Sequence, residues 1–562
     1  MSDRLPATFD SRVLAVVLQV AFAASLALAL STSLAACSRV STSSVPPNQG
    51  GIPGTLRYAI NGVGSLNPLN QTNTAEVDLD MFLYGWFFYV DDHGRFVPDL
   101  ATEVPSYANG GISKDGRTLV YHLRHGVKWQ DGAPFDARDV IFTERAILNP
   151  RNNVFSREGW DRITSIEALD DYTVRITLKE PYAPALATFF APYQHSGYPV
   201  LPAHLLQQYA DLNQVPFNGH PVGTGPFKLK EWVRGDRVEF EANPIYWRGP
   251  PKLKRVIAKI VPDDNTILAQ FESHELDAIL DAPSVQYPRL KMIPGASVSL
   301  VPVSAFTLLA FNTKRPPLDD VRVRQAVAYA VDRQRIIDDV THGVGLLGDT
   351  DIVPGSWASS TDVPRRGYDP AAARRLLRDA GWNAAPDGIL IKNGERLSLN
   401  LTTIAKNATY VQIETLLQQS LRAAGIDAAV KNYPQEMVYG TAADGGVLAS
   451  GRYDIALVGQ NTGIDPDDST LFMCDQVPPA GVNWTFWCDS KFDAAERAAL
   501  GAYDEGSRKR SYELTQHEMA EQLPVIILYY HRLILATTDR FHGLAPTRNT
   551  IFGWNPWQWS ME

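Results

Sequence analysis

The sequence is poor in cysteine and has no surplus of positive charge. Its 562 residues include three cysteines, and 62 acidic residues outnumber 52 lysines and arginines, giving a formal net charge of -10. A nucleic-acid-binding protein normally carries a basic face, so this balance argues against one. Apart from Cys37, only Cys474 and Cys488 remain, and two thiolates are too few for a structural zinc site.

Motifs of catalysis and of metal binding are also lacking. The segment from Gly343 to Gly348 has the letters of a dinucleotide-binding fingerprint, but it follows a predicted helix, whereas the fingerprint must follow a strand. The pair His517-Glu518 lacks the second histidine of a zinc-protease helix. The acidic pairs at 263–264 and 319–320 stand at turns or helix starts, where capping explains them. We therefore expect no enzymatic activity, no cofactor and no metal site.

One long hydrophobic run is present, and it lies at the N-terminus. Arg4 and Arg12 precede an apolar stretch over residues 13–30, which is the pattern of an export signal. The stretch leads to Leu34-Ala35-Ala36-Cys37, and small residues before a cysteine are typical of a lipoprotein signal peptidase site. Polar residues at 31–33 break the run near the minimum spanning length of about 18 residues, which disfavours a transmembrane anchor.

These features predict an exported protein held to a membrane by lipid. The signal peptide covers residues 1–36, Cys37 carries the lipid, and residues 37–54 form a flexible tether rich in Ser, Pro and Gly. The protein would face the periplasm or the cell exterior. Because export places the chain in an oxidising compartment, Cys474 and Cys488 are predicted to form a disulfide. The loop it closes would contribute roughly 3 kcal/mol to stability.

The first part of the mature chain is dominated by strand patterns. They extend from Thr55 to about residue 305, with Pro and Gly at the connections. Residues 162–179 are predicted to form a hairpin that turns at Asp170-Asp171.

Beyond residue 310 helices alternate with strands. Asp319 or Asp320 can cap one helix, and Asp369-Pro370 begins another. Residues 397–430 contain a predicted β-α-β unit. A late strand over 524–530 either closes this domain or crosses back to the first part of the chain. The pattern indicates an α/β domain.

A series of longer motifs spans nearly all of the mature chain. They are Pro98-Asp99-Leu100-Ala101-Thr102, Lys114-Asp115-Gly116-Arg117-Thr118, the segment from Leu123 to Trp129, Ala137-Arg138-Asp139-Val140, Gly223-Thr224-Gly225-Pro226-Phe227, Asn243-Pro244-Ile245-Tyr246-Trp247, Phe311-Asn312-Thr313, the segment from Val321 to Ala326, Tyr368-Asp369-Pro370 and Ala380-Gly381-Trp382. In this order they resemble the extracellular solute-binding proteins of family 5, the dipeptide-, oligopeptide- and nickel-binding lipoproteins of ABC importers.

The resemblance implies an α/β, two-lobed periplasmic-binding-protein fold, type II-like and of cluster C, with an extra domain inserted in the first lobe. The implied bounds are 55–88, 218–305 and 526–562 for lobe I, 89–217 for the extra domain and 306–525 for the α/β lobe II. Ligand would be enclosed between the lobes, which close about a hinge.

The resemblance also indicates ligand-facing residues. In peptide-binding members an aspartate pairs with the α-ammonium of the peptide, and the matching position is Thr462. A neutral hydroxyl cannot replace that charge-assisted contact. Asp465 or Asp467 could compensate from nearby, although either could instead cap a turn. Trp357 and Trp484 lie in loops that border the cleft in relatives.

The function implied is capture of a short peptide and its delivery to ABC permease subunits in the membrane, by a monomer without nucleic-acid partners. Two alternatives stay open. One is the same fold binding an oligosaccharide, an opine or a nickel chelate. The other is a receptor module that presents its loaded form to a signalling partner.

Overall fold

The computed structural model describes residues 52–71, 73–192, 197–548 and 553–562. The predicted signal peptide, the lipidation site at Cys37 and the tether up to residue 51 lie outside these described residues. None of the helices in the described part of the chain is long and apolar enough to cross a membrane.

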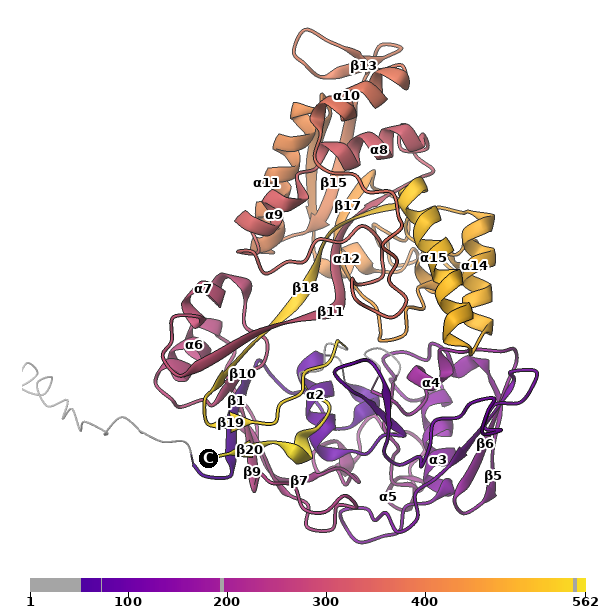
Figure 1. The fold of residues 1–562 in the computed structure, drawn as a ribbon, viewed down its shortest axis with the longest axis vertical. Coiled ribbons are helices and arrows are strands. Elements are labelled where there is room, and N and C mark those ends of the chain that lie inside the picture. The colour runs from indigo at the N-terminus through magenta and orange to yellow at the C-terminus, as the bar shows by residue number, and fades with distance from the viewer. Residues whose placement is uncertain (1–51, 72, 193–196, 549–552) are drawn as a thin grey trace, which may run out of the picture. The chain divides into compact units, whose positions relative to one another are not determined.

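The largest sheet runs through both lobes of the molecule. Its ten strands are ordered β16-β15-β17-β11-β18-β10-β1-β9-β8-β7. Their bounds are β1 (Thr55–Ile60), β7 (Phe227–Val233), β8 (Arg237–Ala242), β9 (Arg255–Ile260), β10 (Ala278–Ile279), β11 (Ala296–Phe311), β15 (Ser398–Ile404), β16 (Asp427–Tyr433), β17 (Ile455–Asn461) and β18 (Val525–Thr538). The long strands β11 and β18 pair antiparallel at its centre and connect the two lobes (Figure 1).

The first lobe contains one end of this sheet. Strand β1 pairs in parallel with β9 and β10, and β10 pairs with β18. Among the described residues of this lobe, the α-helices are α2 (Thr74–Leu83), α6 (Asp264–Glu272) and α7 (Tyr287–Leu290). The C-terminal strands β19 (Phe541–His542) and β20 (Ser560–Met561) pair with each other.

The extra domain is inserted between these strands of the first lobe. Its elements are β2 (Phe88–Val90), β3 (Phe96–Pro98), β4 (Thr118–His122), α3 (Ala137–Leu148), β5 (Ile163–Asp170), β6 (Thr173–Leu178), α4 (Ala185–Thr188) and α5 (Ala203–Leu206). Strands β5 and β6 form the predicted hairpin, and β4 extends it into a sheet of three strands. The hairpin prediction is therefore confirmed.

The second lobe alternates helices and strands, as its sequence predicts. Besides β15 to β17 it contains α8 (Val321–Ala330), α9 (Arg333–Asp339), α10 (Pro370–Asp379), β12 (Asn383–Ala384), β13 (Leu390–Lys392), β14 (Glu395–Arg396), α11 (Ala408–Ala423), α12 (Gln435–Tyr439), α13 (Ser469–Phe472), α14 (Ser490–Gly501) and α15 (Glu505–Gln522). Side chains of Asp320 and Asp369 cap α8 and α10. Strands β15 and β16 are parallel and flank α11, which confirms the predicted β-α-β unit.

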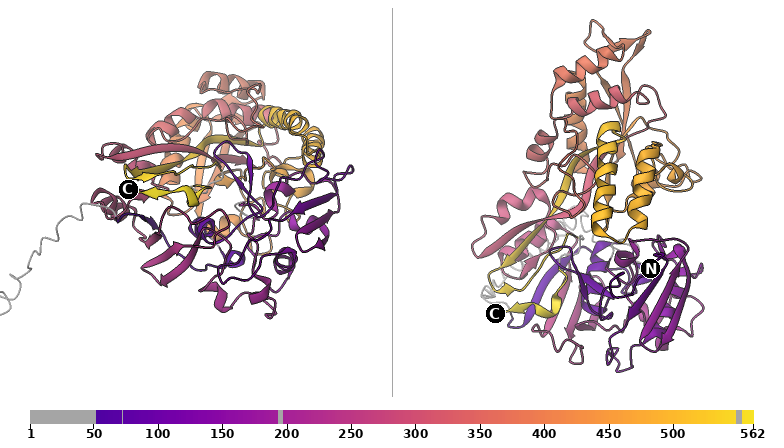
Figure 2. Two further views of the ribbon diagram at one scale, coloured as in Figure 1. Left: turned by 60° about the horizontal axis from the view of Figure 1, so that its bottom comes forward. Right: turned by 45° about the vertical axis from the view of Figure 1, so that its right-hand side comes forward.

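Alternating side chains of β11 explain how helices cover both faces of the sheet in this lobe. Leu309 and Phe311 pack in one apolar cluster with residues of α8, α10 and α11. Phe306, Leu308 and Ala310 pack in another, with residues of α14 and α15. Successive side chains of a strand point to opposite faces, so one apolar run supports two layers. Helices α14 and α15 pack side by side (Figure 2).

The predicted boundaries between the lobes fall inside or beside the long strands. Residues 305 and 306 lie within β11, and residues 525 and 526 lie at the start of β18. The predicted strand at 524–530 is thus the beginning of a longer strand that crosses to the first lobe. The lobes share two continuous strands, and the exact domain bounds stay a prediction.

Candidate functional site

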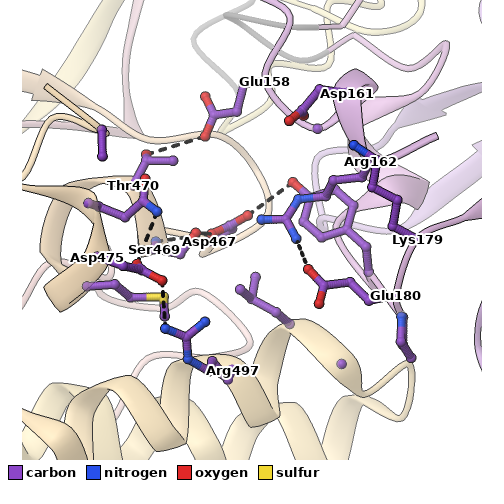
Figure 3. Close-up of a pocket in the computed structure, with 18 of the residues that line it drawn as sticks. Glu158, Asp161, Arg162, Lys179, Glu180, Asp467, Ser469, Thr470, Asp475 and Arg497 are labelled. Atoms are coloured by element: carbon purple, nitrogen blue, oxygen red, sulfur yellow. Dashed lines mark hydrogen bonds and ion pairs between the residues drawn. The ribbon is translucent and has the colours of Figure 1, made fainter. Parts of the chain in front are cut away.

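A cavity of about 850 Å³ lies where the extra domain meets the second lobe (Figure 3). Residues around the β5–β6 hairpin line one side of it, and the segment from Asp467 to Ala480, together with the end of α14, lines the other. A pocket with walls from both lobes is the arrangement by which ligand binding can favour closure.

Local structure explains which side chains reach the cavity. Arg162 immediately precedes β5, and Glu180 and Tyr182 follow β6, so the hairpin brings them to one edge. In the second lobe, the loop after β17 leads through Asp467 into the short helix α13.

The positive charges at the cavity are mostly engaged within their own lobes. Arg162 forms an ion pair with Glu180 at 2.7 Å, and Arg497 forms one with Asp475 at 2.8 Å. Arg157 donates hydrogen bonds to backbone carbonyl oxygens. Within the described ranges, no arginine or lysine forms an ion pair with Glu158 or Asp467.

Direct contacts join the lobes beside the cavity. The Tyr182 hydroxyl donates to Oδ2 of Asp467 at 3.1 Å, and the Thr470 hydroxyl donates to Oε1 of Glu158 at 3.3 Å. The backbone N–H of Ala183 donates to the carbonyl of Leu500 at 2.7 Å. The cavity is therefore bordered by hydrogen bonds that exist only while the two lobes touch.

The carboxyl groups of Glu158 and Asp467, which form no ion pair in the described ranges, both have raised pKa values. Burial raises the pKa of Asp467, and the nearby charge of Asp465 adds to the effect. Glu158 is an exposed residue, but partial loss of solvation at its carboxyl group raises its pKa. The negative charge of Asp467 raises the pKa of Glu158 further, whereas the Thr470 hydroxyl and the positive charge of Arg162 lower it. Burial and like charge both disfavour the ionised form of a carboxyl group.

The segment that contains Thr462 leads from the central strands toward this cavity. The backbone N–H and the hydroxyl of Thr462 both donate to the carbonyl of Ser304 in β11, at 2.7 and 3.2 Å. Its neighbour Asn461 lines a smaller cavity of about 220 Å³, together with first-lobe residues such as Gln71 and Asp80. Thr462 thus lies next to the junction of the lobes, with its hydroxyl bonded to the strand they share.

Asp465 is buried and forms an ion pair with an arginine. Its two carboxylate oxygens accept hydrogen bonds from Arg508 of α15 at 2.6 and 2.7 Å. Arg508 also donates to the hydroxyl of Tyr512. Asp465 therefore joins its loop to α15, and it does not line either cavity.

The two predicted tryptophans lie elsewhere in the second lobe. The ring of Trp357 packs edge-on against Tyr512, with Arg508 over its face. Trp484 packs against Tyr439. Neither lines the two cavities. Trp357 and Asp465 both contact Arg508 and so lie at one place, whereas Thr462 is bonded to β11 and Trp484 lies against Tyr439.

The structure contains the predicted disulfide between Cys474 and Cys488. It closes the loop that follows α13, and residues of this loop line the larger cavity. Asn483, inside the loop, donates to three backbone carbonyls and is completely buried. The disulfide therefore braces one wall of the cavity.

One group of side chains in the described part of the chain is spaced closely enough to hold a metal ion. It comprises Asp91, Asp92 and His93. These residues lie at the turn between β2 and β3, outside both cavities, and Asp91 is bound by Arg95.

Two lobes that share two continuous strands, with a mixed-charge cavity at their junction, are the arrangement expected of a solute-binding protein. The model of the bacterial extracellular solute-binding proteins of family 5 (middle) matches residues 95–479, and the chain belongs to this family. The resemblance inferred from the sequence motifs is thereby confirmed. The family is one of solute-binding proteins, and the chain is classed with them.

Its relatives include peptide- and nickel-binding proteins. The chain is 27% identical to the oligopeptide-binding protein AppA of Bacillus subtilis, over 92% of this chain and 94% of AppA. It is 30% identical to the di/tripeptide-binding protein 1 of Pseudomonas aeruginosa, over 74% of this chain and 78% of that protein. The crystal structure of NikZ from Campylobacter jejuni with Ni(L-His) matches with a TM-score of 0.73 at 28% identity, covering 91% of this chain and all of NikZ.

Proposed function

We propose that this protein binds short peptides between its two lobes and delivers them to the permease of an ABC importer, while lipid on Cys37 holds it at the membrane. The observation that carries the proposal is the cavity lined by both lobes and by side chains of both charges. A peptide carries an ammonium and a carboxylate, so it can engage both kinds of side chain. The peptide-binding relatives support this choice of ligand.

Thr462, Trp357 and Trp484 remain proposed ligand contacts. Thr462 has the strongest support, since it adjoins a residue that lines a cavity between the lobes. Asp465 has less support, because Arg508 occupies both of its carboxylate oxygens. We propose that it shapes the site through the loop it anchors.

A nickel chelate is the second candidate ligand, supported by the similarity to NikZ. We favour the peptide because Asp91, Asp92 and His93, the side chains in the described ranges that are close enough together to bind a metal ion, lie outside both cavities.

A thermal-shift screen of the purified mature protein tests the proposal. The panels are di- to pentapeptides, oligosaccharides, opines and nickel-histidine complexes. A bound ligand at a hundredfold excess over its dissociation constant adds about 2.7 kcal/mol to the free energy of unfolding. We expect that shift with peptides. A shift with only sugars, opines or nickel complexes, or with no panel at all, would contradict the proposal.

A further inference from the structure

The following inference rests on the proposed function and adds a side-chain preference to it. We propose that the smaller cavity, of about 220 Å³, is a specificity pocket that receives one aromatic side chain of the bound peptide against the ring of Phe155. Phe155 is then a specificity-determining residue that the extra domain contributes to the site.

Residues from all three parts of the molecule line this cavity. Phe155 and Tyr198 belong to the extra domain, and Asn461 is the last residue of β17 in the second lobe. The first lobe contributes the start of α2, with Thr74 and Val77. A ligand side chain placed here would touch both lobes, so its binding energy favours the closed state over the open one.

The smaller and the larger cavity lie along the same two segments of the chain. In the extra domain, Phe155 borders the smaller cavity and Glu158 borders the larger one. In the second lobe, Asn461 and Asp467 border the two cavities in the same way. Three residues of chain span at most about 11 Å, which is also the reach of an extended tripeptide. A peptide bound in the larger cavity can therefore place one side chain in the smaller one.

Phe155 is 58% exposed, although the loop that carries it is held firmly. Arg157 donates hydrogen bonds to three backbone carbonyls of the preceding segment. The backbone N–H of Ser156 donates to the Tyr198 hydroxyl at 3.1 Å, and this hydroxyl donates to the Ser156 carbonyl at 2.8 Å. A ring fixed in this way offers a large apolar surface to a ligand, and little conformational freedom is lost when the ligand binds.

The volume of the cavity suits one ring and not a whole peptide. An apolar cavity of about 150 Å³ binds benzene, whereas pockets for complete small ligands have roughly 300–1,000 Å³. At about 220 Å³ the cavity has room for the phenyl ring of a phenylalanine or the phenol ring of a tyrosine. Ring pairs in edge-on or offset contact gain binding energy beyond that of the buried area.

The polar side chains that the first lobe contributes to the cavity are engaged with neighbouring groups of that lobe. The Gln71 amide donates to the Asp80 carboxyl group at 2.9 Å and to the Glu76 carbonyl at 3.2 Å. The Asn73 side chain accepts from the backbone N–H of Glu76 at 3.1 Å. These bonds leave apolar contact as the main interaction that the first-lobe wall offers to a ligand.

The lining also disfavours a charged side chain. Burial raises the pKa of Asp80 well above its usual value of 3.8, and the charges of Glu76 and Asp78 add to the effect. The Gln71 amide opposes them. Burial thus favours the neutral form of this carboxyl group. None of the described residues that line the cavity is an arginine or a lysine.

The test uses a synthetic library of random tri- to pentapeptides. Purified protein is incubated with the library, and the composition of the retained peptides is compared with that of the input by mass spectrometry. We expect phenylalanine and tyrosine to be enriched at one position of the retained peptides by roughly 3- to 10-fold relative to alanine.

Two variants change the cavity in different ways. Phe155→Ala removes the ring of the wall and should abolish the enrichment. Thr74→Phe, at an exposed position of α2, places a ring of the protein in the cavity and should shift the retained peptides toward glycine and alanine. Phe155→Tyr keeps a ring and should keep the enrichment.

The control is Tyr209→Ala, which removes an exposed ring of the extra domain that lines neither cavity, and it should keep the enrichment. Circular dichroism and thermal unfolding verify that each variant is folded.

The outcomes separate this inference from the proposed function. If the wild-type protein retains no peptides, the proposed function fails. If it retains peptides without enriching phenylalanine or tyrosine, or enriches lysine or arginine instead, peptides bind but the cavity does not select a ring. Enrichment that persists in both Phe155→Ala and Thr74→Phe would also overturn the inference.

Discussion

Asp465 and Asp467 are separated by one residue and have different environments. Both carboxylate oxygens of Asp465 accept hydrogen bonds from Arg508. Asp467 accepts hydrogen bonds only from hydroxyl groups and a backbone N–H. The Asp465–Arg508 pair is almost inaccessible to solvent, with 8% of each side chain exposed. A buried ion pair with one partner removed leaves an uncompensated charge in the interior.

We predict that Asp465→Asn lowers the free energy of unfolding by about 3–5 kcal/mol, because Arg508 would stay buried without its counter-charge. Urea unfolding followed by tryptophan fluorescence and circular dichroism measures the loss. The matched control is Asp475→Asn, whose pair with Arg497 has more than half of each side chain exposed. That change should cost about 1 kcal/mol or less. Equal losses in the two variants would contradict the assigned role of Asp465.

The sequence could predict part of the candidate site and no more. Resemblance placed the segment around Thr462 at the junction of the lobes, and Asp467 was recognisable as a nearby acid. The sequence could not show that Asp465 forms an ion pair, because its partner Arg508 lies 43 positions away on α15. It gave no sign of Glu158 or Tyr182, since their contacts arise only when the extra domain meets a lobe encoded about 300 residues later.

At the scale of elements, helix α14 carries an acidic residue into the interior of the second lobe. Glu496 is completely buried, and neither of its carboxylate oxygens has a hydrogen-bond partner in the described part of the chain. Burial raises its pKa well above the usual value of 4.5, and the charges of Asp467 and Asp351 raise it further, while Arg508 opposes them. Burial also raises the pKa values of Asp351 and Asp468, and the charge of Asp351 adds to the effect on Asp468.

These shifts predict a protein that is less stable at higher pH. The folded state keeps protons that the unfolded state releases, so the stabilisation is complete below pH 4.5 and is lost as pH rises through the raised pKa. Each such proton contributes a slope of about 1.4 kcal/mol per pH unit. Glu496→Gln should reduce the fall in stability between pH 5 and pH 8, as measured by urea unfolding at each pH.

Glu513→Gln, an exposed change on the neighbouring helix α15, serves as the control and should leave the slope of the wild-type protein unchanged. If the Glu496→Gln variant shows the same slope as this control, then Glu496 does not hold the proton.

Local elements of the fold were predictable where short-range signals decide them. The caps at Asp320 and Asp369 and the β5–β6 hairpin depend on residues a few positions apart. The sequence of helix α15 has no clear apolar stripe from which the helix could be predicted, because its buried face includes polar residues. These are Arg508, Tyr512, Thr515 and Gln516. The full length of β11 and β18 could not be predicted from the sequence either, since the two strands pair through residues more than 200 positions apart.

At the scale of the whole molecule, β11 and β18 provide a place where the lobes can bend. Their pairing is interrupted between Pro302 and Phe306, and the register shifts there. A bulge of this kind bends a strand and weakens the ladder locally. Thr462 is bonded to Ser304 within this same interruption. We infer that the loop containing Thr462 and the bulged part of the shared strands move together.

Closure also depends on contacts far from that bend, and Tyr503 provides one. Its hydroxyl lies within hydrogen-bonding distance of the carbonyls of Gly116 and Tyr182, at 3.2 and 3.0 Å. Both acceptors belong to the extra domain, whereas Tyr503 follows α14 of the second lobe. We predict that Tyr503→Phe reduces the population of the closed state, because the ring stays packed while the bonds between the lobes are lost.

The apparent dissociation constant for a retained peptide should rise by roughly 2- to 10-fold in this variant, in proportion to the lost closed population. Small-angle X-ray scattering should show a larger radius of gyration without ligand and a return to the wild-type value at saturating peptide. Tyr107→Phe is the control, because the Tyr107 ring packs edge-on against Tyr503 and is half exposed. If the two variants bind and scatter alike, the Tyr503 hydroxyl does not favour closure, and the cavity contacts alone must hold the lobes together.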